Sequence, residues 1–213
     1  MKEILYSHFE NFIDLTEYEF EYIYSHLKIK KYKKHQFLFQ EGDVVSFDYF
    51  IINGIVKTYL VDVDGKERII DLSYDNLWIS DYPNLFEQSA TNLFASCIVD
   101  TQVCCLSIDD IDKLSEEIPS ILKYFRMRGR QGIIKREKRI TSLLMLNIKE
   151  RLEMFKSDFS PIFNKLPKSI IASYIGVSRE TLSRLNKKKR NNTLYPYPFL
   201  SLQKSRKKDL ILQ

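Results

Sequence analysis

The sequence predicts an α+β protein in which an antiparallel β domain precedes a helical C-terminal half. Residues 35–107 hold short β-rich runs separated by turn residues, and the apolar period becomes helical from Ile108. Two short helices then follow around Gly176, which suits a tight turn. We therefore expect a β domain over residues 1–117, a long helix over 118–146, a helix-turn-helix domain over 147–190 and a tail over 191–213 to which we assign no structure.

The N-terminal segment predicts short helices over residues 8–28. Its apolar residues recur at helical spacing, and Thr16 before Glu17 and Glu19 can start the second helix. A basic patch over residues 28–34 ends this region.

Six runs rich in β-forming residues follow. They cover residues 37–39, 48–52, 55–61, 67–72, 93–99 and 102–107. The turn signals between them are Glu41-Gly-Asp43, Asn53-Gly54 and Asp64-Gly65, and Asn-Gly and Asp-Gly favour type I′ hairpins. Short strands at regular spacing predict a sandwich or barrel.

The helical half begins with a short helix near Asp109 and Asp110. Pro119 suits the first turn of a long helix that ends near Leu146. Gly129 and Gly132 weaken that helix by ~1 kcal/mol each relative to alanine. The plainest interpretation of the pattern is a single long helix packed on its own β domain. Its apolar stripe contains Ile121, Leu122, Phe125, Ile133, Ile140, Leu143 and Leu144.

A further helix covers residues 147–159, and the last predicted unit is a helix-turn-helix. Its first helix spans about residues 168–174, and Ser178 is a good N-cap for a second helix that reaches about Lys188. The inward residues are Ile171, Ile175, Val177, Leu182 and Leu185, and the outward residues are Arg179, Glu180, Ser183, Arg184 and Lys187. An ordinary helical hairpin could show the same spacing. Arginine and glutamate on one helix face favour a DNA-reading helix, because both can bind base edges.

Charge divides the chain in the same way. Residues 1–112 carry 9 Lys and Arg against 20 Asp and Glu, a net charge of −11. Residues 113–213 carry 24 against 8, a net charge of +16. A basic half that contains a helix-turn-helix predicts a nucleic-acid partner.

Cysteine and histidine usage indicates no metal site. Cys97, Cys104 and Cys105 lack the paired spacing of a disulfide framework or a zinc site, and the three histidines form no HxH or HExxH pattern. No apolar run approaches the ~20 residues of a membrane span, and the N-terminus lacks the apolar core of a signal peptide. We therefore expect a cytoplasmic protein without a membrane partner.

Several stretches carry a specific resemblance. Ser178-Arg-Glu-Thr-Leu-Ser-Arg184 resembles the recognition helix of the Crp/Fnr family of bacterial transcription regulators, and residues 171–176 resemble the helix before it. Gln40-Glu-Gly-Asp43, residues 49–57 and Asp64-Gly-Lys-Glu67 resemble the jelly-roll-like β-roll of the cyclic-nucleotide-binding superfamily.

The resemblance implies a sequence-specific DNA-binding regulator of transcription. It implies a homodimer on a palindromic site in double-stranded DNA, with the long helix as the seam and RNA polymerase as a partner, and no catalysis. Arg179, Glu180 and Arg184 would contact bases, in a half-site related to TGTGA. The phosphate contacts would be Ser178, Thr181, Ser183, Lys187 and Lys188.

The sequence departs from the family where a cyclic nucleotide would bind. Ser80-Asp81 and Thr91-Asn92 stand where cyclic-nucleotide binders have Gly-Glu and the arginine that pairs the phosphate. Residues 69–112 contain no Lys or Arg, and a buried phosphate needs a cation or several amide donors. Cyclic AMP is therefore not the expected effector.

The sequence predicts no cofactor. The resemblance leaves room for a small-molecule effector of unknown identity. The Fnr branch holds an iron–sulfur cluster with N-terminal cysteines, and this chain has none before Cys97. The candidate effector pocket comprises Trp78, Ser80, Asp81, Tyr82, Phe86, Thr91, Asn92 and Phe94. Its four aromatic residues would surround one cavity for an apolar or aromatic effector, or else simply fill the interior of the roll.

Two other functions compete with this one. One is a protein that senses a nucleotide or small molecule and acts on protein partners, which the recognition-like helix and the basic half disfavour. The other is a β-roll enzyme with an accessory domain, for which the sequence offers no metal triad, Ser/Cys–His pair or phosphate loop. After residue 190 the family expects a β-hairpin wing, but residues 191–200 contain two prolines and no alternating strand pair.

Overall fold

A computed structural model describes residues 1–187 of the chain. Two helices open it, α1 (Lys2–Glu10) and α2 (Glu17–Ser25). The predicted start of the second is confirmed by a capping box: the Thr16 hydroxyl accepts from the Glu19 amide, and the Glu19 carboxylate accepts from the Thr16 amide at 2.8 Å. α1 begins earlier than predicted, and Phe12 and Leu15 lie between the helices rather than on them.

Within the described residues, eight strands form two antiparallel sheets, which confirms the predicted β-roll. They are β1 (Lys28–Tyr32), β2 (Phe37–Phe39), β3 (Phe47–Asn53), β4 (Ile55–Val61), β5 (Glu67–Tyr74), β6 (Trp78–Ile79), β7 (Phe94–Cys97) and β8 (Thr101–Ser107). One sheet has the order β1-β8-β3-β6 and the other β2-β7-β4-β5. The segment predicted as a basic patch is therefore strand β1 in part, and β6 was not predicted.

The central strands β3 and β8 of the first sheet are buried on both faces, which explains their continuous apolar runs. Tyr49, Ile51 and Cys105 point into the roll, where they pack with Val56 of the other sheet. The alternate residues Phe50 and Cys104 point outward, into a second core made with the helices.

The expectation of a hairpin at Asn53-Gly54 is wrong. This pair joins β3 in one sheet to β4 in the other. Gly54 has φ +139°, and a Cβ atom there would lie 2.3 Å from Thr101 Oγ1. Glycine is therefore required by a close approach between strands, whereas Asp64-Gly65 does lie in the β4–β5 hairpin.

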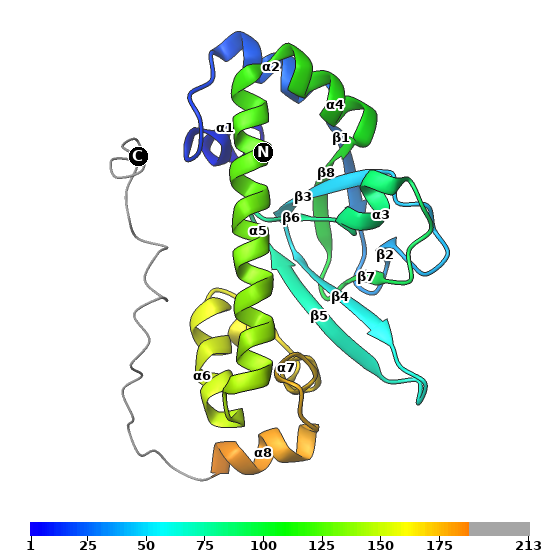
Figure 1. Ribbon diagram of the computed structural model, residues 1–213, viewed down its shortest axis with the longest axis vertical. Helices are drawn as coiled ribbons and strands as arrows, with labels where there is room; N and C mark the ends of the chain where they lie inside the picture. Colours follow the sequence, from blue (N-terminus) through cyan, green and yellow to red (C-terminus); the bar gives the residue numbers. More distant parts are fainter. Residues whose placement is uncertain (188–213) are drawn as a thin grey trace.

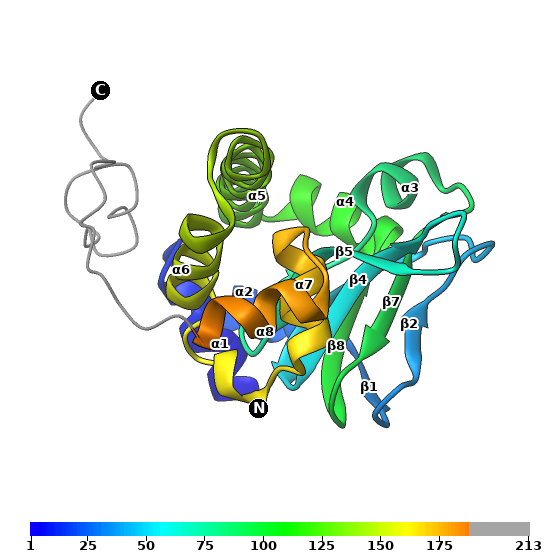
Figure 2. The same ribbon diagram turned by 90° about the horizontal axis from the view of Figure 1, so that it is seen from below.

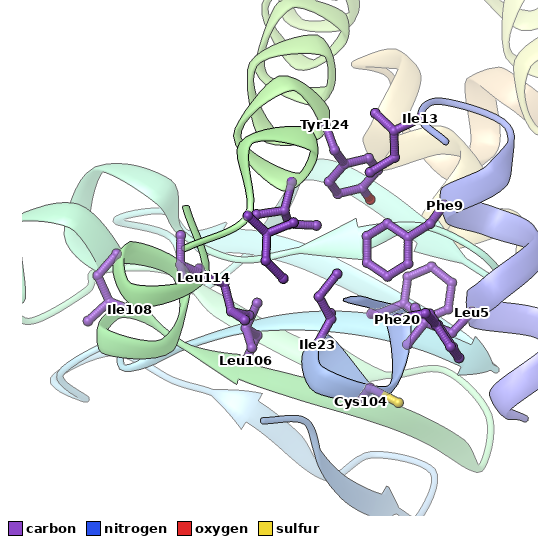
Figure 3. Packing of buried hydrophobic residues seen from close by; sticks show 14 of the residues in the cluster. Leu5, Phe9, Ile13, Phe20, Ile23, Cys104, Leu106, Ile108, Leu114 and Tyr124 are labelled. Atoms are coloured by element: carbon purple, nitrogen blue, oxygen red, sulfur yellow. The ribbon is translucent and has the colours of Figure 1, made fainter. Parts of the chain in front are cut away.

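Three helices follow or interrupt the strands: α3 (Tyr82–Glu87), α4 (Ile108–Glu117) and α5 (Pro119–Met145). α5 runs beside the roll from the N-terminal helices to the C-terminal helices (Figure 1). As predicted, Pro119 occupies its first turn, and the helix ends at Met145, with Leu146 as the C-cap. Its N-terminal half contributes Ile121 and Tyr124, both fully buried, to the core shown in Figure 3.

Most of the apolar stripe predicted on α5 is exposed. Of its residues only Ile121 is fully buried, and Phe125 is partly buried against the same core. The stripe as a whole therefore does not pack on the chain's own roll. The exposed apolar residues are Leu122, Ile133, Ile140, Leu143 and Leu144, joined by Ile134 and Met145.

The C-terminal unit contains α6 (Ile148–Asp158), a short 3-10 helix η1 (Phe163–Lys165), α7 (Lys168–Ile175) and α8 (Arg179–Lys187). Asn147 caps α6 with a capping box. Viewed from below, α8 lies on the outer side of α7, away from the sheets (Figure 2). Ile69 and Leu72 of the roll share one hydrophobic cluster with Leu152, Phe155 and Ile171 of this unit. Within residues 1–187 no helix combines the length and apolar character needed to cross a bilayer.

Candidate DNA-binding helix and ligand groove

The turn between α7 and α8 has the predicted chemistry. Gly176 ends α7 in the left-handed conformation, with φ +75°. The Ser178 hydroxyl accepts from the Thr181 amide at 3.2 Å, as an N-cap residue does. The inner residues Ile175 and Leu182 are buried at 2% and 1% exposure, so the helix pair has a closed core.

The outer face of α8 presents the residues predicted to read bases. Arg179, Glu180 and Arg184 are exposed together. Hydrogen bonds from the Glu180 amide and the Ser178 hydroxyl, together with the nearby arginines, lower the pKa of the Glu180 carboxyl. Glu180 therefore stays an ionised acceptor at neutral pH, which suits a donor such as cytosine N4.

The residues predicted to contact phosphate lie along the same helix. Ser178 is exposed, and Thr181 and Ser183 are half-buried. Lys187 is the last residue of α8. Lys188 lies outside the described residues. The tail over residues 191–213, where the family expects a wing, also lies outside them.

A polar contact fixes α7 to strand β5. Ser173 Oγ donates to the Glu67 carbonyl at 2.8 Å and accepts from the Ile69 amide at 3.1 Å. Arg139 of α5 donates to the Ile69 carbonyl at 2.7 Å, and its guanidinium lies 3.6 Å from the centre of the Tyr174 ring. The C-terminal unit of α6, α7 and α8 is thereby oriented against the roll and α5 together.

The buried polar side chains of the candidate effector pocket already form hydrogen bonds with other groups of the protein. Thr91 Oγ1 and Asn84 Nδ2 each donate to Asp81 Oδ2 at 2.6 Å, and Ser80 Oγ donates to the Phe47 carbonyl at 2.9 Å. Ser80, Asp81 and Thr91 are buried, whereas Asn92 is exposed. Donors and acceptors that would bind a cyclic nucleotide here already have partners.

The four predicted aromatic residues do not surround one cavity. Trp78, Tyr82 and Phe86 line a groove beside α5, although Phe86 is 63% exposed. Phe94 lies on the other sheet and stacks on Tyr59 at 5.2 Å between ring centres. The expectation of a single cavity is therefore wrong, because Trp78 and Tyr82 pack against one hydrophobic cluster and Phe94 packs against another.

Sequence reasoning missed the central ion pair of this groove. Arg128 of α5 donates to Asp48 of β3 at 2.5 Å, and Tyr82 donates to the same carboxylate at 3.2 Å. Asp48 is fully buried, and burial raises the pKa of its carboxyl although Arg128 opposes the rise. Asp48 within an apolar strand was the one available signal, since a charge there needs a buried partner.

A histidine from the first helix joins the same network. His8 Nε2 lies 2.8 Å from the Tyr124 hydroxyl, and the His8 ring packs against Phe50 at 4.8 Å between ring centres. Burial, and then the charge of Arg128, lower the pKa of His8 to about 4. His8 is therefore neutral at pH 7.

The cysteines do not fit an iron–sulfur cluster. Cys97 and Cys105 point into the roll and Cys104 points to its outer face. All three are buried free thiols. In residues 1–187 no group of three or more His, Cys, Asp or Glu side chains is placed to hold a metal ion.

Comparison with known proteins defines the class. Residues 29–117 match the cyclic nucleotide-binding domain family. Over 186 residues the chain is 31% identical to the fumarate and nitrate reduction regulatory protein of Yersinia pestis, covering 80% of this chain and 72% of that protein. The anaerobic regulatory protein of Pasteurella multocida is 28% identical over 186 residues, covering 80% of this chain and 66% of that protein. These relatives are regulators of transcription and not enzymes. The chain belongs to the Crp/Fnr family, as the sequence predicted.

Solved structures share the fold. The c-di-GMP-responsive global regulator CLP of Xanthomonas campestris has a TM-score of 0.67 at 18% identity, covering 81% of this chain and 91% of that one. A CRP/FNR-family transcriptional regulator of Thermus thermophilus has a TM-score of 0.62 at 18% identity, covering 78% and 90%. The roll, long helix and C-terminal helices are thus arranged as in known regulators.

Proposed function

We propose that this protein binds a roughly palindromic site in double-stranded DNA as a homodimer, in the cytoplasm, and thereby regulates transcription. The observation that carries the proposal is the outer face of α8, where Arg179, Glu180 and Arg184 are exposed together above a closed core. A helix that presents such side chains from its N-terminal half can enter the major groove.

Side-chain chemistry separates the residues of α8 that would contact bases from those that would contact phosphates. Arg179 and Arg184 can each bind guanine through two hydrogen bonds, and the ionised Glu180 can accept from cytosine. Ser178, Thr181, Ser183, Lys187 and Lys188 would hold phosphates and set the register without reading sequence. A half-site related to TGTGA is the expected target.

The reading face can be tested on one arginine. Arg184→Ala should cost about 1–3 kcal/mol per half-site and relax specificity at one base pair. Sites would first be selected from random oligonucleotides with the wild-type chain, and binding then compared on the selected and scrambled DNA at several salt concentrations. Lys156→Ala is the matched control, because Lys156 lies on α6 in an ion pair with Glu153. Equal weakening on both DNAs would make Arg184 a phosphate contact instead.

The dimer is supported by the exposed apolar stripe of α5. Leu122, Ile133, Ile140 and Leu144 are 55%, 60%, 57% and 78% exposed, and apolar residues in such numbers along one helix favour burial by a partner. A two-fold seam there would place two recognition helices ~34 Å apart, one turn of DNA.

Light scattering tests the seam. Ile133→Glu should convert a dimer into a monomer, because it places a charge in the apolar contact. Val63→Glu, at a fully exposed valine on the β4–β5 hairpin, should leave the dimer intact. A wild-type chain that is monomeric both free and on DNA would contradict the proposal.

Two further partners belong to the proposal. RNA polymerase is the expected protein partner of a regulator bound beside a promoter, and an effector other than cyclic AMP would act through the roll. A chain that binds no DNA in the selection would instead favour regulation through protein partners.

A further inference from the structure

A strict seven-residue repeat runs along the exposed side of α5. Its core positions are spaced alternately four and three residues apart, as in a two-stranded coiled coil. All of them are exposed in the single chain. They are Leu122, Arg126, Gly129, Ile133, Arg136, Ile140 and Leu143. Two arginines and a glycine therefore lie among the apolar residues of the dimer seam proposed above, and apolar contact alone does not account for them.

The charge of α5 opposes the pairing of two copies. The helix carries eight Lys and Arg but a single acid, Glu137. Two such helices side by side repel each other. The one acid follows directly after Arg136, a core position of the repeat, so the only negative charge of the helix lies at the edge of the seam.

Neither member of this adjacent pair has an ionic partner within its own chain. Neighbouring helix positions do not face each other, whereas residues three and four positions apart do. At those distances Glu137 has no cation and Arg136 has no acid. Within residues 1–187, the ion pairs of α5 run from Arg128 to Asp48 and from Lys135 to Asp71. Arg136 and Glu137 thus remain available to a second chain.

The position of α8 determines the orientation of that second chain. α8 lies beyond the C-terminal end of α5 (Figure 1). Two copies of α8 reach one DNA site only if the C-terminal ends of both α5 helices lie on the same side, so the two helices run parallel. In a parallel pair, each core side chain enters a hole formed by four residues of the facing helix. For Arg136, that hole includes the partner's Glu137.

We propose that Arg136 of each protomer forms an ion pair with the partner's Glu137, and that these two symmetric pairs offset the repulsion between the helices and fix their parallel register. The inference rests on the dimer proposed above and names a contact that holds it. In the single chain, the Arg136 guanidinium lies 5.7 Å from the centre of the Tyr82 ring, near the ~6 Å limit of a cation–π contact. Little is therefore lost when this side chain turns to the seam.

Mixing two charge variants tests the pairing between chains. Arg136→Glu leaves two acids at this point of the seam, and Glu137→Arg leaves two cations. Each variant alone should therefore dimerise roughly tenfold or more weakly than the wild type, because like charges meet across the seam. When the two are mixed, every cation faces an acid of the other chain. The mixture should form heterodimers in preference to either homodimer.

Native mass spectrometry of the full chains, free of DNA, would count the dimers. One variant carries an affinity tag, so that the three possible dimers differ in mass, and tagged and untagged wild type should mix at random. Sedimentation equilibrium would give the dissociation constants. The double variant Arg136→Glu/Glu137→Arg should recover a dissociation constant within about threefold of the wild type, because the pair is restored with its polarity reversed.

Arg126→Gln is the matched control. It also removes an arginine from an exposed core position of α5, but the partner's neighbouring residues include no acid. The dimer of this variant should be at least as tight as that of the wild type, because two like charges no longer face each other. A loss of dimer equal to that of Arg136→Glu would show that any core arginine supports the seam through packing, and would overturn the ion pair.

The outcomes separate this inference from the dimer itself. A wild-type dimer together with random mixing of the two variants, or a double variant as weak as the single ones, would refute the ion pair and leave the proposed dimer standing. A wild-type chain that stays monomeric, with no heterodimer in the mixture, would refute both. Arg136 and Glu137 are exposed in the single chain, so circular dichroism should show that each variant folds as the wild type does.

Discussion

The two ends of α5 are held in different ways. At its N-terminal end, Ile121 and Tyr124 are fully buried among aromatic side chains from the first helices and the roll. Beyond Tyr124 only Ser142 of this helix is buried, and the helix is held by polar contacts such as Arg139 to Ile69. The N-terminal end of α5 therefore cannot leave the roll without loss of a core, whereas its C-terminal end is held by polar contacts and by the hydrophobic cluster that the C-terminal helices share with β5.

The largest expected effect is at the buried end. Tyr124→Ala should destabilise the folded chain by about 3–5 kcal/mol, because it removes a buried ring and leaves a cavity among Phe9, Phe12 and Phe125. Denaturant unfolding followed by circular dichroism would measure it. Lys123→Ala, at the exposed neighbouring position, should change stability by less than about 0.5 kcal/mol. If Tyr124→Ala weakened DNA binding without lowering the free energy of unfolding, the N-terminal end of α5 would not be the part that holds this helix on the roll.

The free energy of unfolding should depend on pH through His8, which lies at the same end of α5. His8 has a pKa lowered to about 4 by burial and Arg128, whereas the unfolded chain titrates near 6.5. Between these values the unfolded chain binds a proton that the native chain does not. The free energy of unfolding should therefore fall as pH drops from about 6.5 towards 4, by at most roughly 3 kcal/mol.

Unfolding of wild type and His8→Gln at pH 7 and pH 4.5 would isolate this contribution. The variant should lose less stability on acidification than the wild type does. His26→Gln, at a histidine outside the Tyr124 contact, should behave as the wild type. An unchanged acid sensitivity in His8→Gln would place the responsible group elsewhere.

The smallest effect is expected at the contact between α7 and β5. Ser173→Ala removes the acceptor of the Ile69 amide and a donor to the Glu67 carbonyl, at a cost of about 0.5–1.5 kcal/mol. Hydrogen exchange at the Ile69 amide should accelerate severalfold while that of buried Phe50 stays unchanged. Ser169→Ala, exposed on the same helix, is the control. Equal acceleration at both amides would show that the two ends unfold as one unit.

Local signals explain what the sequence could predict. Pro119, Gly176 and the caps at Thr16 and Ser178 act through backbone geometry within a few residues, and each lies where expected. Strand β1 was missed because lysines fill three of its five positions. Such residues suit an edge strand, which needs only main-chain pairing with β8 and resists pairing with other chains.

Non-local contacts explain what it could not predict. Asn53-Gly54 carries a hairpin signal, yet its use as a sheet crossing depends on Thr101, far along the chain. Asp48 and Arg128 are 80 positions apart, so no spacing could join them. The aromatic character of Phe94 groups it with Trp78, although the two side chains pack against different hydrophobic clusters. The roles of the candidate DNA and effector residues stay predictions.

The contact between α7 and β5 also has a consequence for solubility. β5 is the eight-residue outer strand of its sheet, so part of its backbone is unpaired by any neighbouring strand. Ser173 and Arg139 occupy the Glu67 carbonyl and both backbone groups of Ile69. If the C-terminal unit of α6, α7 and α8 were displaced, these groups would be free to pair with a strand of another chain. We therefore expect Ser173, which orients this unit, also to block a site where strands of two chains could pair.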